Sequence, residues 1–316
     1  NNYTITSQGS TTADITAKLL TVNAELTSAT KEYDGTTTAV VTRSGLVGLV
    51  ADEDITATGG GNYDNMNVGT GKAITINYTL QDGETSGLAS NYTISEQTIN
   101  TGIITTKTLT YTVAANDKTY DGNTNASVAL TFSGTIGSET VTESNSSTFD
   151  TKNVGSNKTV TVNSITLADG TNGGLASNYS ISTGGTTTAD ISAAALTYTV
   201  AANDKTYDGN TTASVALTFS GTMGSETLTA TNTATFDTKN AGTGKTVTVN
   251  SITLSDGTNG GLATNYSITT GNTTTADINV KALTVNAELT SATKIYDGNA
   301  TAEITNASLI GLVGDE

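Results

Sequence analysis

The sequence predicts an all-β protein made of tandem antiparallel β-sandwich domains. Three observations predict this fold class. A unit of about 87 residues recurs along the chain, apolar and polar residues alternate within short segments, and turn signals separate these segments. No stretch of ten or more residues shows helical spacing of its apolar side chains, so no helix is expected.

The repeat is marked most clearly by a phrase that reads Lys-x-Tyr-Asp-Gly. It occurs four times, with its tyrosines 87, 87 and 89 residues apart. The four copies consist of Lys31, Tyr33, Asp34 and Gly35; Lys118, Tyr120, Asp121 and Gly122; Lys205, Tyr207, Asp208 and Gly209; and Lys294, Tyr296, Asp297 and Gly298. A second tyrosine, which follows an asparagine, recurs as Tyr3, Tyr92, Tyr179 and Tyr266. Such self-similarity is characteristic of an array of similar domains.

These markers divide the chain into three complete units and two partial ones. We expect the tail of a preceding repeat at 1–18, a variant repeat at 19–107, nearly identical repeats at 108–194 and 195–281, and the start of the next variant at 282–316. The last assignment rests on LTVNAELTSATKEYDG at 20–35, which returns as LTVNAELTSATKIYDG at 283–298.

Three segments of the unit 108–194 have the alternation of half-buried strands. They are LTYTVAA at 109–115, SVALTF at 127–132 and KTVTVNSITL at 158–167. The turn sequences YDGN, GTIGS, KNVGSN and DGTNGG separate strands along the unit. About seven strands per unit favour a sandwich. A parallel β-solenoid is the alternative, but its coils would repeat every 20–30 residues or so, and the sequence has no such shorter period.

One strand skips a position in its alternation. The skip falls at Asn163, whereas the corresponding strand of the variant repeat, AITINYTL at 73–80, alternates strictly and is one residue shorter. An inserted residue that changes the facing of a strand is a β-bulge. The sequence therefore predicts bulges at Asn163 and Asn250 and none at Asn77.

The boundary between units lacks a linker. TTTADISAAALTYTVAAN at 186–203 passes from one unit into the next without glycine or proline, so it is neither a flexible nor a stiff extended linker. We expect one strand to continue across the boundary and to join the domains end to end in a rod. Contact between neighbouring repeats would add stability that a single small unit lacks.

The charge of the chain excludes one class of partner. Lys and Arg number 13 and Asp and Glu 29, which gives a formal net charge of −16. Nucleic-acid binding needs a basic surface, so nucleic acid is not expected as a partner. No stretch approaches the roughly 20 apolar residues of a membrane helix, so no membrane insertion is expected in this segment.

The residue types also limit the chemistry. The chain has no histidine and no cysteine, so it lacks an imidazole base, a thiolate nucleophile and soft metal ligands. We therefore expect no enzyme activity and no cofactor. Calcium is the one metal considered, at DGTNGG (169–174 and 256–261), but one aspartate per loop is a poor supply of ligands and a turn is favoured.

The Lys-x-Tyr-Asp-Gly phrase itself suits a structural turn. An aspartate side chain can accept hydrogen bonds from nearby N–H groups, and glycine adopts positive φ at little cost. We expect the tyrosine ring to be buried and its hydroxyl to bond a backbone group, as in the tyrosine corner of other sandwiches. The alternative is a charged site formed by Lys118 and Asp121. Repetition in every unit favours the structural interpretation.

These residues carry a resemblance to a known family. The pattern K-x-Y-D-G, a later GLA-S/T-NY-T/S-I segment and an A-D-I ending resemble the YDG and "mostly bacterial Ig-like" (MBG) repeats of large filamentous-haemagglutinin-like bacterial surface exoproteins. The residues that carry it, with their counterparts in other repeats, are Lys118, Tyr120, Asp121, Gly122, Gly174, Leu175, Asn178, Tyr179 and Asp190. The variant repeat departs from the pattern at 100–107, where NTGIITTK leaves Asp190 without a counterpart.

The resemblance implies a secreted, extracellular tandem-repeat stalk of an adhesin or matrix filament, with no catalytic residues. Neighbouring repeats of the same chain are the first expected partners. Lateral self-association into fibres is the second, because strand edges rich in threonine and poor in charge can pair with another chain. The alternative function is a module that binds glycan or host protein, with Tyr63, Tyr78 and Tyr111 as stacking faces.

Overall fold

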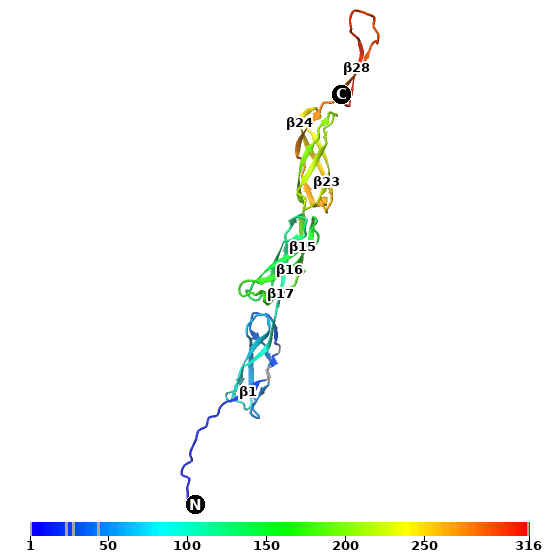
Figure 1. The fold of residues 1–316 in the computed structure, drawn as a ribbon. Coiled ribbons are helices and arrows are strands. Elements are labelled where there is room, and N and C mark those ends of the chain that lie inside the picture. Colours follow the sequence, from blue (N-terminus) through cyan, green and yellow to red (C-terminus); the bar gives the residue numbers. More distant parts are fainter. Residues whose placement is uncertain (1, 23–24, 27–28, 43–44, 315) are drawn as a thin grey trace. The chain divides into compact units, whose positions relative to one another are not determined.

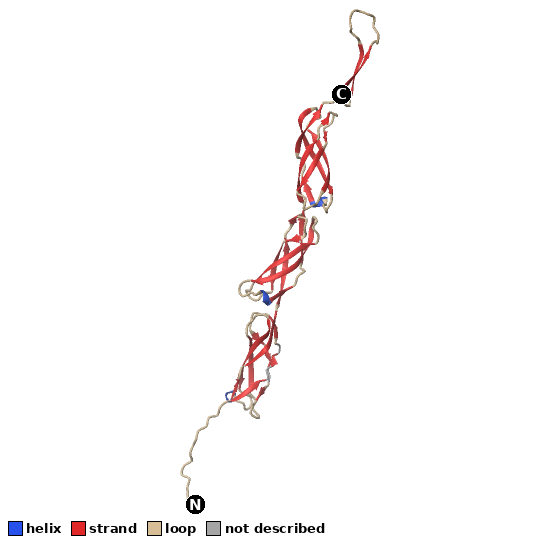
Figure 2. Ribbon diagram, viewed as in Figure 1, coloured by secondary structure: helices blue, strands red, loops and turns tan. Residues whose placement is uncertain are grey.

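The computed structural model describes residues 2–22, 25–26, 29–42, 45–314 and 316 (Figure 1). Strands account for nearly all of its regular structure, and the described helical segments are short 3-10 turns (Figure 2). The strands form three complete repeats and a C-terminal hairpin. The predicted all-β class and tandem units of about 87 residues are confirmed. No described helix has the length and apolarity to cross a membrane.

The first repeat contains a three-stranded sheet, a five-stranded sheet and a two-stranded pair. Its elements are β1 (Lys18–Val22), β2 (Glu25–Leu26), β3 (Thr30–Glu32), β4 (Thr38–Ala39), β5 (Val41–Thr42), β6 (Leu46–Val47), β7 (Thr56–Tyr63), β8 (Gly69–Gln81), η1 (Ala89–Asn91), β9 (Tyr92–Ile94) and β10 (Gln97–Thr105). The strand orders are β6-β1-β9, β3-β10-β8-β7-β4 and β2-β5.

The second repeat has the same two sheets without the extra pair. Its elements are β11 (Lys107–Ala115), β12 (Lys118–Thr119), β13 (Asn125–Ala126), β14 (Val128–Ser133), β15 (Val141–Phe149), β16 (Gly155–Asp169), η2 (Ala176–Asn178), β17 (Tyr179–Ile181) and β18 (Thr186–Ser192). The orders are β14-β11-β17 and β12-β18-β16-β15-β13.

The third repeat copies the second, and a hairpin follows it. The elements are β19 (Ala194–Ala202), β20 (Lys205–Thr206), β21 (Thr212–Ala213), β22 (Val215–Ser220), β23 (Leu228–Phe236), β24 (Gly242–Asp256), η3 (Ala263–Asn265), β25 (Tyr266–Ile268), β26 (Thr273–Asn279), β27 (Thr284–Leu289) and β28 (Ile304–Ile310). The orders are β22-β19-β25, β20-β26-β24-β23-β21 and β27-β28.

The sheets contain parallel as well as antiparallel strand pairs, whereas the sequence predicted antiparallel pairs alone. In each repeat the first strand runs parallel to a short strand near the end, as β19 does to β25. A second parallel pair joins the strand before the Tyr-Asp-Gly turn to the last strand, as β20 does to β26. Alternation within one strand specifies its faces but not the direction of a distant partner. The alternative of a solenoid is not the topology observed, because the strands return to the two sheets within each repeat.

The predicted bulge at Asn250 is present. In the β23–β24 pair Thr233 lies opposite Ser251 and Ala234 lies opposite Val249, which leaves Asn250 as the inserted residue. The β7–β8 pair of the variant repeat keeps an unbroken register through Asn77, as predicted. Residues 163 and 164 of β16 are both exposed, as are residues 250 and 251 of β24, which fits the bulge predicted at Asn163.

Single residues separate the last strand of one repeat from the first strand of the next. β10 ends at Thr105 and β11 begins at Lys107, and β18 ends at Ser192 and β19 begins at Ala194. The expected continuous strand is therefore two strands that belong to different sheets. The backbone at the break bonds the neighbouring turn, because the Tyr33 N–H donates to the Thr105 carbonyl at 2.9 Å.

The chain divides into two compact units that do not coincide with the repeats. One comprises residues 1–114, 128–147 and 162–186, and the other comprises residues 115–127, 148–161 and 187–316. The first unit thus includes the whole first repeat together with β14, β17 and most of β11 of the second. The second unit includes β12, β13 and the third repeat with its hairpin. Each unit therefore contains one boundary between two complete repeats.

Buried side chains connect neighbouring repeats within a unit. One apolar cluster of the first unit combines Tyr33, Ile74 and Ile104 of the first repeat with Leu109 and Tyr179 of the second. Burial of each such side chain contributes about 1.5–3 kcal/mol. The apolar core therefore continues across the repeat boundary.

Candidate functional site

The lysine and aspartate of the repeated phrase stabilise its turn. Lys118 Nζ donates to Asp121 Oδ1 at 2.8 Å and to the carbonyls of Asn123 and Asn125, both at 2.9 Å. The same ammonium lies 5.4 Å from the centre of the Phe149 ring. Equivalent contacts surround Lys31 and Lys205. The amine is therefore held inside the turn, which favours the structural interpretation over a charged site.

The aspartate of this turn remains a carboxylate. Burial acts to raise the pKa of Asp121, but the hydrogen bond from Lys118 and the N–H of Asn123 outweigh burial and lower that pKa. The same Lys–Asp contact forms at Lys294 and Asp297, where Nζ and Oδ1 are 2.9 Å apart, although Tyr296 is 92% exposed. The turn is thus a local structure that does not require a buried tyrosine.

The glycine of the phrase has a conformation and a neighbour that exclude a side chain. Gly35 has φ +74°, and a Cβ there would lie 2.7 Å from Ile136 Cγ2 of the next repeat. Gly209 is similar, because a Cβ at that position would lie 2.7 Å from Val313 Cγ1. The turn therefore packs directly against the following repeat.

Gly35→Ala is expected to destabilise the first unit by about 1–2 kcal/mol from the left-handed backbone alone, with the contact to Ile136 adding to that. Gly71→Ala is the matched control, because Gly71 has φ +67° but open space around it. Denaturant unfolding should show a larger loss for Gly35→Ala than for Gly71→Ala. Equal losses would mean that the contact with Ile136 has no energetic role.

The tyrosine of the phrase reaches into the next repeat. Tyr33 Oη donates to Glu139 Oε1 at 2.6 Å, and Tyr179 Oη, from the second repeat itself, donates to Glu139 Oε2 at 2.5 Å. The two rings pack edge to face with centres 5.5 Å apart. The expected backbone partner is therefore wrong for Tyr33, since its partner is a carboxylate 106 residues away. Tyr179 does bond the backbone, accepting the Ile136 N–H at 3.0 Å.

The second boundary repeats this arrangement and adds a cation. Tyr120 and Tyr266 each donate to Glu226 at 2.6 Å, one to each carboxylate oxygen. Lys152 Nζ lies 2.6 Å from Glu226 Oε1 and 5.9 Å from the centre of the Tyr120 ring. Met66 takes the corresponding place at the first boundary, where it packs against the apolar cluster. The carboxylate is thus held by two phenols, with a lysine as a third donor at the second boundary.

Burial and hydrogen bonding shift the titration of this cluster. Burial acts to raise the pKa of Glu226, but donors from Lys152, Tyr120 and Tyr266 outweigh burial and lower that pKa. Burial and the nearby carboxylate together raise the pKa of Tyr266 to about 12. Burial, followed by the hydrogen bond to Glu226, also raises the pKa of Tyr120. At neutral pH the cluster therefore contains one carboxylate and two neutral phenols.

A buried asparagine provides a second set of bonds at each boundary. Asn178 is fully buried, accepts the Val68 N–H at 2.9 Å and donates to Asn67 Oδ1 at 3.1 Å. Asn265 makes the same bonds, at 2.9 and 3.1 Å, to the backbone of residue 154 and the side chain of residue 153. The recurring Asn-Tyr pair therefore contacts the preceding repeat with both side chains, the asparagine through hydrogen bonds and the tyrosine through its ring.

We call each such boundary a joint. The first joint consists of Tyr33, Gly35, Asn67 and Val68 with Ile136, Glu139, Asn178 and Tyr179. The second joint consists of Tyr120, Gly122, Lys152, Asn153 and Val154 with Met223, Glu226, Asn265 and Tyr266.

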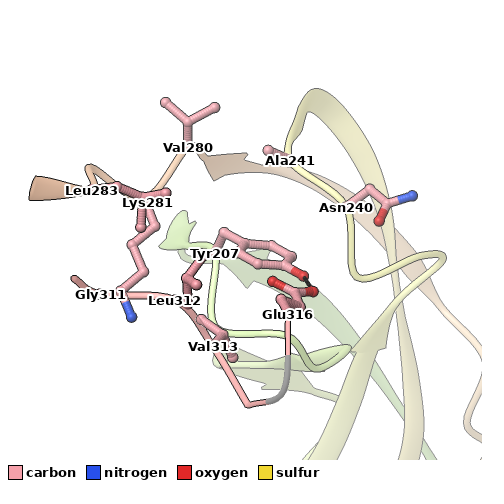
Figure 3. A pocket seen from close by; sticks show the side chains of 10 residues that line it. All are labelled: Tyr207, Asn240, Ala241, Val280, Lys281, Leu283, Gly311, Leu312, Val313 and Glu316. Atoms are coloured by element: carbon pink, nitrogen blue, oxygen red, sulfur yellow. Dashed lines mark hydrogen bonds between the residues drawn. The ribbon is translucent and has the colours of Figure 1, made fainter. Parts of the chain in front are cut away.

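Part of a third joint forms with the C-terminal segment. Tyr207 donates to the Glu316 carboxylate (Figure 3). Lys239 Nζ lies 3.6 Å from the same oxygen. A pocket of about 300 Å³ opens beside this pair, lined also by Asn240, Val280 and Leu312. Tyr207, Lys239 and Glu316 correspond to Tyr120, Lys152 and Glu226 of the second joint, so the pocket belongs to a joint of the same kind and is not a separate site.

The other tyrosines for which the sequence predicted a role lie outside the two complete joints. Tyr92 Oη donates to Glu53 and accepts the Val50 N–H at 3.0 Å. These are the bonds that Tyr179 makes to Glu139 and Ile136 in the first joint. Tyr3 is 96% exposed. The three tyrosines that could have formed stacking faces are engaged in contacts within the chain. Tyr63 is buried, Tyr78 Oη bonds Gln97 at 3.1 Å, and Tyr111 Oη accepts the N–H of residue 185 at 3.0 Å.

The loops considered for calcium are closed by their own bonds. Asp169 Oδ1 accepts the Ala176 N–H at 2.8 Å, and Asn172 Nδ2 donates to the Ser138 carbonyl at 2.9 Å. The described residues contain no group of three or more acidic side chains placed to hold a metal ion. These contacts explain the loop sequence as a turn.

Comparison with known families agrees with this repeat structure. The family model of the YDG domain matches residues 16–99, 105–189 and 192–276. The chain belongs to the YDG domain family. No curated protein sequence matches it. In these YDG domains the lysine and aspartate form the turn, the tyrosine bonds the next domain's glutamate, and the glycine permits close packing.

The glutamates of the YDG joints were not predicted from the sequence. Glu139 and Glu226 recur 87 residues apart in the phrase Gly-Ser-Glu-Thr, of which only the glycine and serine of the second repeat were predicted to lie in a turn, GTIGS. This regular spacing within the chain was the available signal, but nothing local pairs either glutamate with a tyrosine 106 residues before it. Lys152 and the Asn67–Asn178 contact were missed for the same reason.

We expect the YDG joints to stabilise the chain less at low pH and at high pH than near neutral pH. Because the pKa of Glu226 is lowered in the folded chain, its contribution is present above the ordinary value of about 4.3 and is lost as pH falls below it. Because the pKa of Tyr266 is raised from about 10 to about 12, its contribution is present below pH 10 and is lost as pH rises towards 12. Denaturation midpoints measured across this range test both losses. Tyr266→Phe should remove part of the alkaline loss, and an unchanged alkaline profile would contradict the assignment.

Proposed function

We propose that this chain is a structural segment of a stalk or fibre in a large secreted bacterial surface protein, of the filamentous-haemagglutinin-like adhesins or matrix filaments. It acts outside the cell and carries out no catalysis. Duplication of its YDG domains lengthens the stalk and does not multiply a chemical activity. The resemblance of the repeats to those of such exoproteins and their tandem order support this assignment.

The joint is the single observation that carries the proposal. Each complete joint buries an asparagine and two tyrosines that share one glutamate between consecutive domains, and a single residue links the domains. A chain of freely moving binding modules would need linkers rich in glycine, serine or proline, and these are absent. Contacts of this kind between consecutive domains would resist bending of a stalk at the domain boundaries.

Sedimentation velocity and small-angle scattering of the intact fragment test the proposal. We expect a frictional ratio and maximum dimension far above those of a compact sphere of 31.9 kDa. Glu226→Ala is the matched variant, and we expect it to give a broader distribution of dimensions at unchanged mass. A compact particle would exclude a stalk.

The alternative of a glycan- or protein-binding module gains no support from the proposed tyrosines. The hydroxyls of Tyr63, Tyr78 and Tyr111 all have intramolecular partners. The Tyr111 ring also packs edge to face against Phe132 at 6.4 Å. The stalk is therefore the function that we propose.

A further inference from the structure

The outer strand of the three-stranded sheet offers an unused backbone edge. In the third repeat β22 is the edge strand and pairs, among the described strands, with β19 alone. The Asn203 N–H donates to the Ser214 carbonyl at 3.0 Å, which fixes residue 214 as one that bonds towards β19. Since antiparallel bonding alternates, the backbone groups of Val215, Leu217 and Phe219 point away from β19.

This edge lacks the devices by which proteins normally protect strand edges. β22 reads VALTFS and has six residues in unbroken register, with no charge, proline, glycine or bulge. Its side chains at Ala216 and Thr218 are exposed, and those at Val215, Leu217 and Phe219 are half-buried. Short uncharged segments of high β-propensity pair readily with their own kind.

The three-stranded sheet of the third repeat differs from the five-stranded sheet of the same repeat in its charged residues. The strands β19, β22 and β25 contain no charged residue. In contrast, Lys245 and Asp256 lie on β24 and Asp277 lies on β26 of the five-stranded sheet. In a chain of net charge −16, the uncharged sheet is where a second copy meets the least repulsion.

The second repeat has the same edge. β14 is again VALTFS and is again the edge of a three-stranded sheet.

We propose that the VALTFS edge of β22 binds the same edge of a second copy of this chain, in antiparallel register centred on Leu217, and that β14 offers the equivalent edge, centred on Leu130, to a further copy. In that register the half-buried residues align as Leu217 with Leu217 and Val215 with Phe219. The exposed residues Ala216 and Thr218 align with each other and present no bulky or charged group. This inference rests on the proposed stalk function and names the surface by which stalks associate laterally.

A pair of lysine substitutions on the edge tests the inference. Thr131→Lys with Thr218→Lys places a charge on both exposed edges and leaves the backbone bonds to the central strand intact. Ser144→Lys with Thr231→Lys is the matched control, since it adds the same charge at exposed strand positions of the five-stranded sheets. Far-UV circular dichroism and thermal unfolding check that each variant folds. Ala129→Lys with Ala216→Lys is a second edge variant that replaces the first should the first unfold.

Sedimentation velocity of the full fragment over a wide concentration range gives the readout. At about 0.15 M salt and above, where the Debye length is about 8 Å or less, we expect the unchanged chain and the control to associate. The edge variant should associate at least about tenfold more weakly, because the lysines of the two copies lie diagonally across the new strand pair, on one face and about 7–8 Å apart, and repel each other. An unchanged chain that stays monomeric, or an edge variant that associates as strongly as the control, would overturn the inference. The frictional ratio of the monomer reports on the stalk separately, so the two proposals can fail independently.

Discussion

Tyr120→Ala should lower the free energy of unfolding of the chain by about 3–5 kcal/mol, the range for truncating a large buried aromatic residue. The side chain is 1% exposed, packs at 5.5 Å against the Tyr266 ring and donates to Glu226. Its removal leaves a cavity in the second joint and takes one donor from a buried carboxylate. Urea denaturation of the full fragment, followed by circular dichroism, measures the loss.

Two controls separate the contributions to that loss. Tyr120→Phe removes only the hydroxyl and should cost about 1–2 kcal/mol, since one buried acceptor loses a donor. Tyr296→Ala makes the same change in the copy of the phrase whose ring is 92% exposed, and it should leave stability nearly unchanged. Similar losses for Tyr120→Ala and Tyr296→Ala would show that the phrase, and not the joint, determines the effect.

Glu226→Ala should cost about 2–4 kcal/mol, because three donors converge on this carboxylate. It would leave the hydroxyls of Tyr120 and Tyr266 and the ammonium of Lys152 without their shared acceptor. Glu226 is 7% exposed, so water replaces the lost acceptor poorly. The same denaturation experiment measures this loss.

The corresponding substitution at the first joint, Glu139→Ala, provides a comparison for Glu226→Ala. Glu139→Ala removes the same two phenol bonds at the first joint, where methionine stands in place of the lysine. Its loss should be smaller than that of Glu226→Ala, and Lys152→Met should reduce the difference. A Glu226→Ala variant as stable as the parent would show that the joint contributes no cohesion between repeats.

The predictable part of the fold depends on short-range information. Alternation within a strand identified the strands around 109–115, 127–132 and 158–167, and a skipped position located the bulge at Asn250. The turn of Lys118 and Asp121 was also predictable, because its bonding partners lie within seven residues. These features are encoded by neighbours in the sequence.

The joint depends on contacts that no local pattern specifies. Tyr33 and Glu139 are 106 residues apart, and their pairing requires that one repeat end where the next begins. The parallel pairing of β19 with β25 likewise depends on the course of the whole repeat. The sequence showed that the tyrosine of the phrase is important in each repeat. Its carboxylate partner became evident only from the fold.

A distance measurement across the second joint tests most directly whether the YDG joint fixes neighbouring domains to each other. The chain contains no cysteine, so Thr188→Cys on β18 and Thr231→Cys on β23 introduce two unique sites for spin labels on either side of the joint. Double electron–electron resonance should give one narrow distance distribution in the parent and a broad one when Glu226→Ala is added. An equally broad distribution in both proteins would contradict the conclusion that the Tyr-Glu-Tyr cluster holds consecutive domains in place.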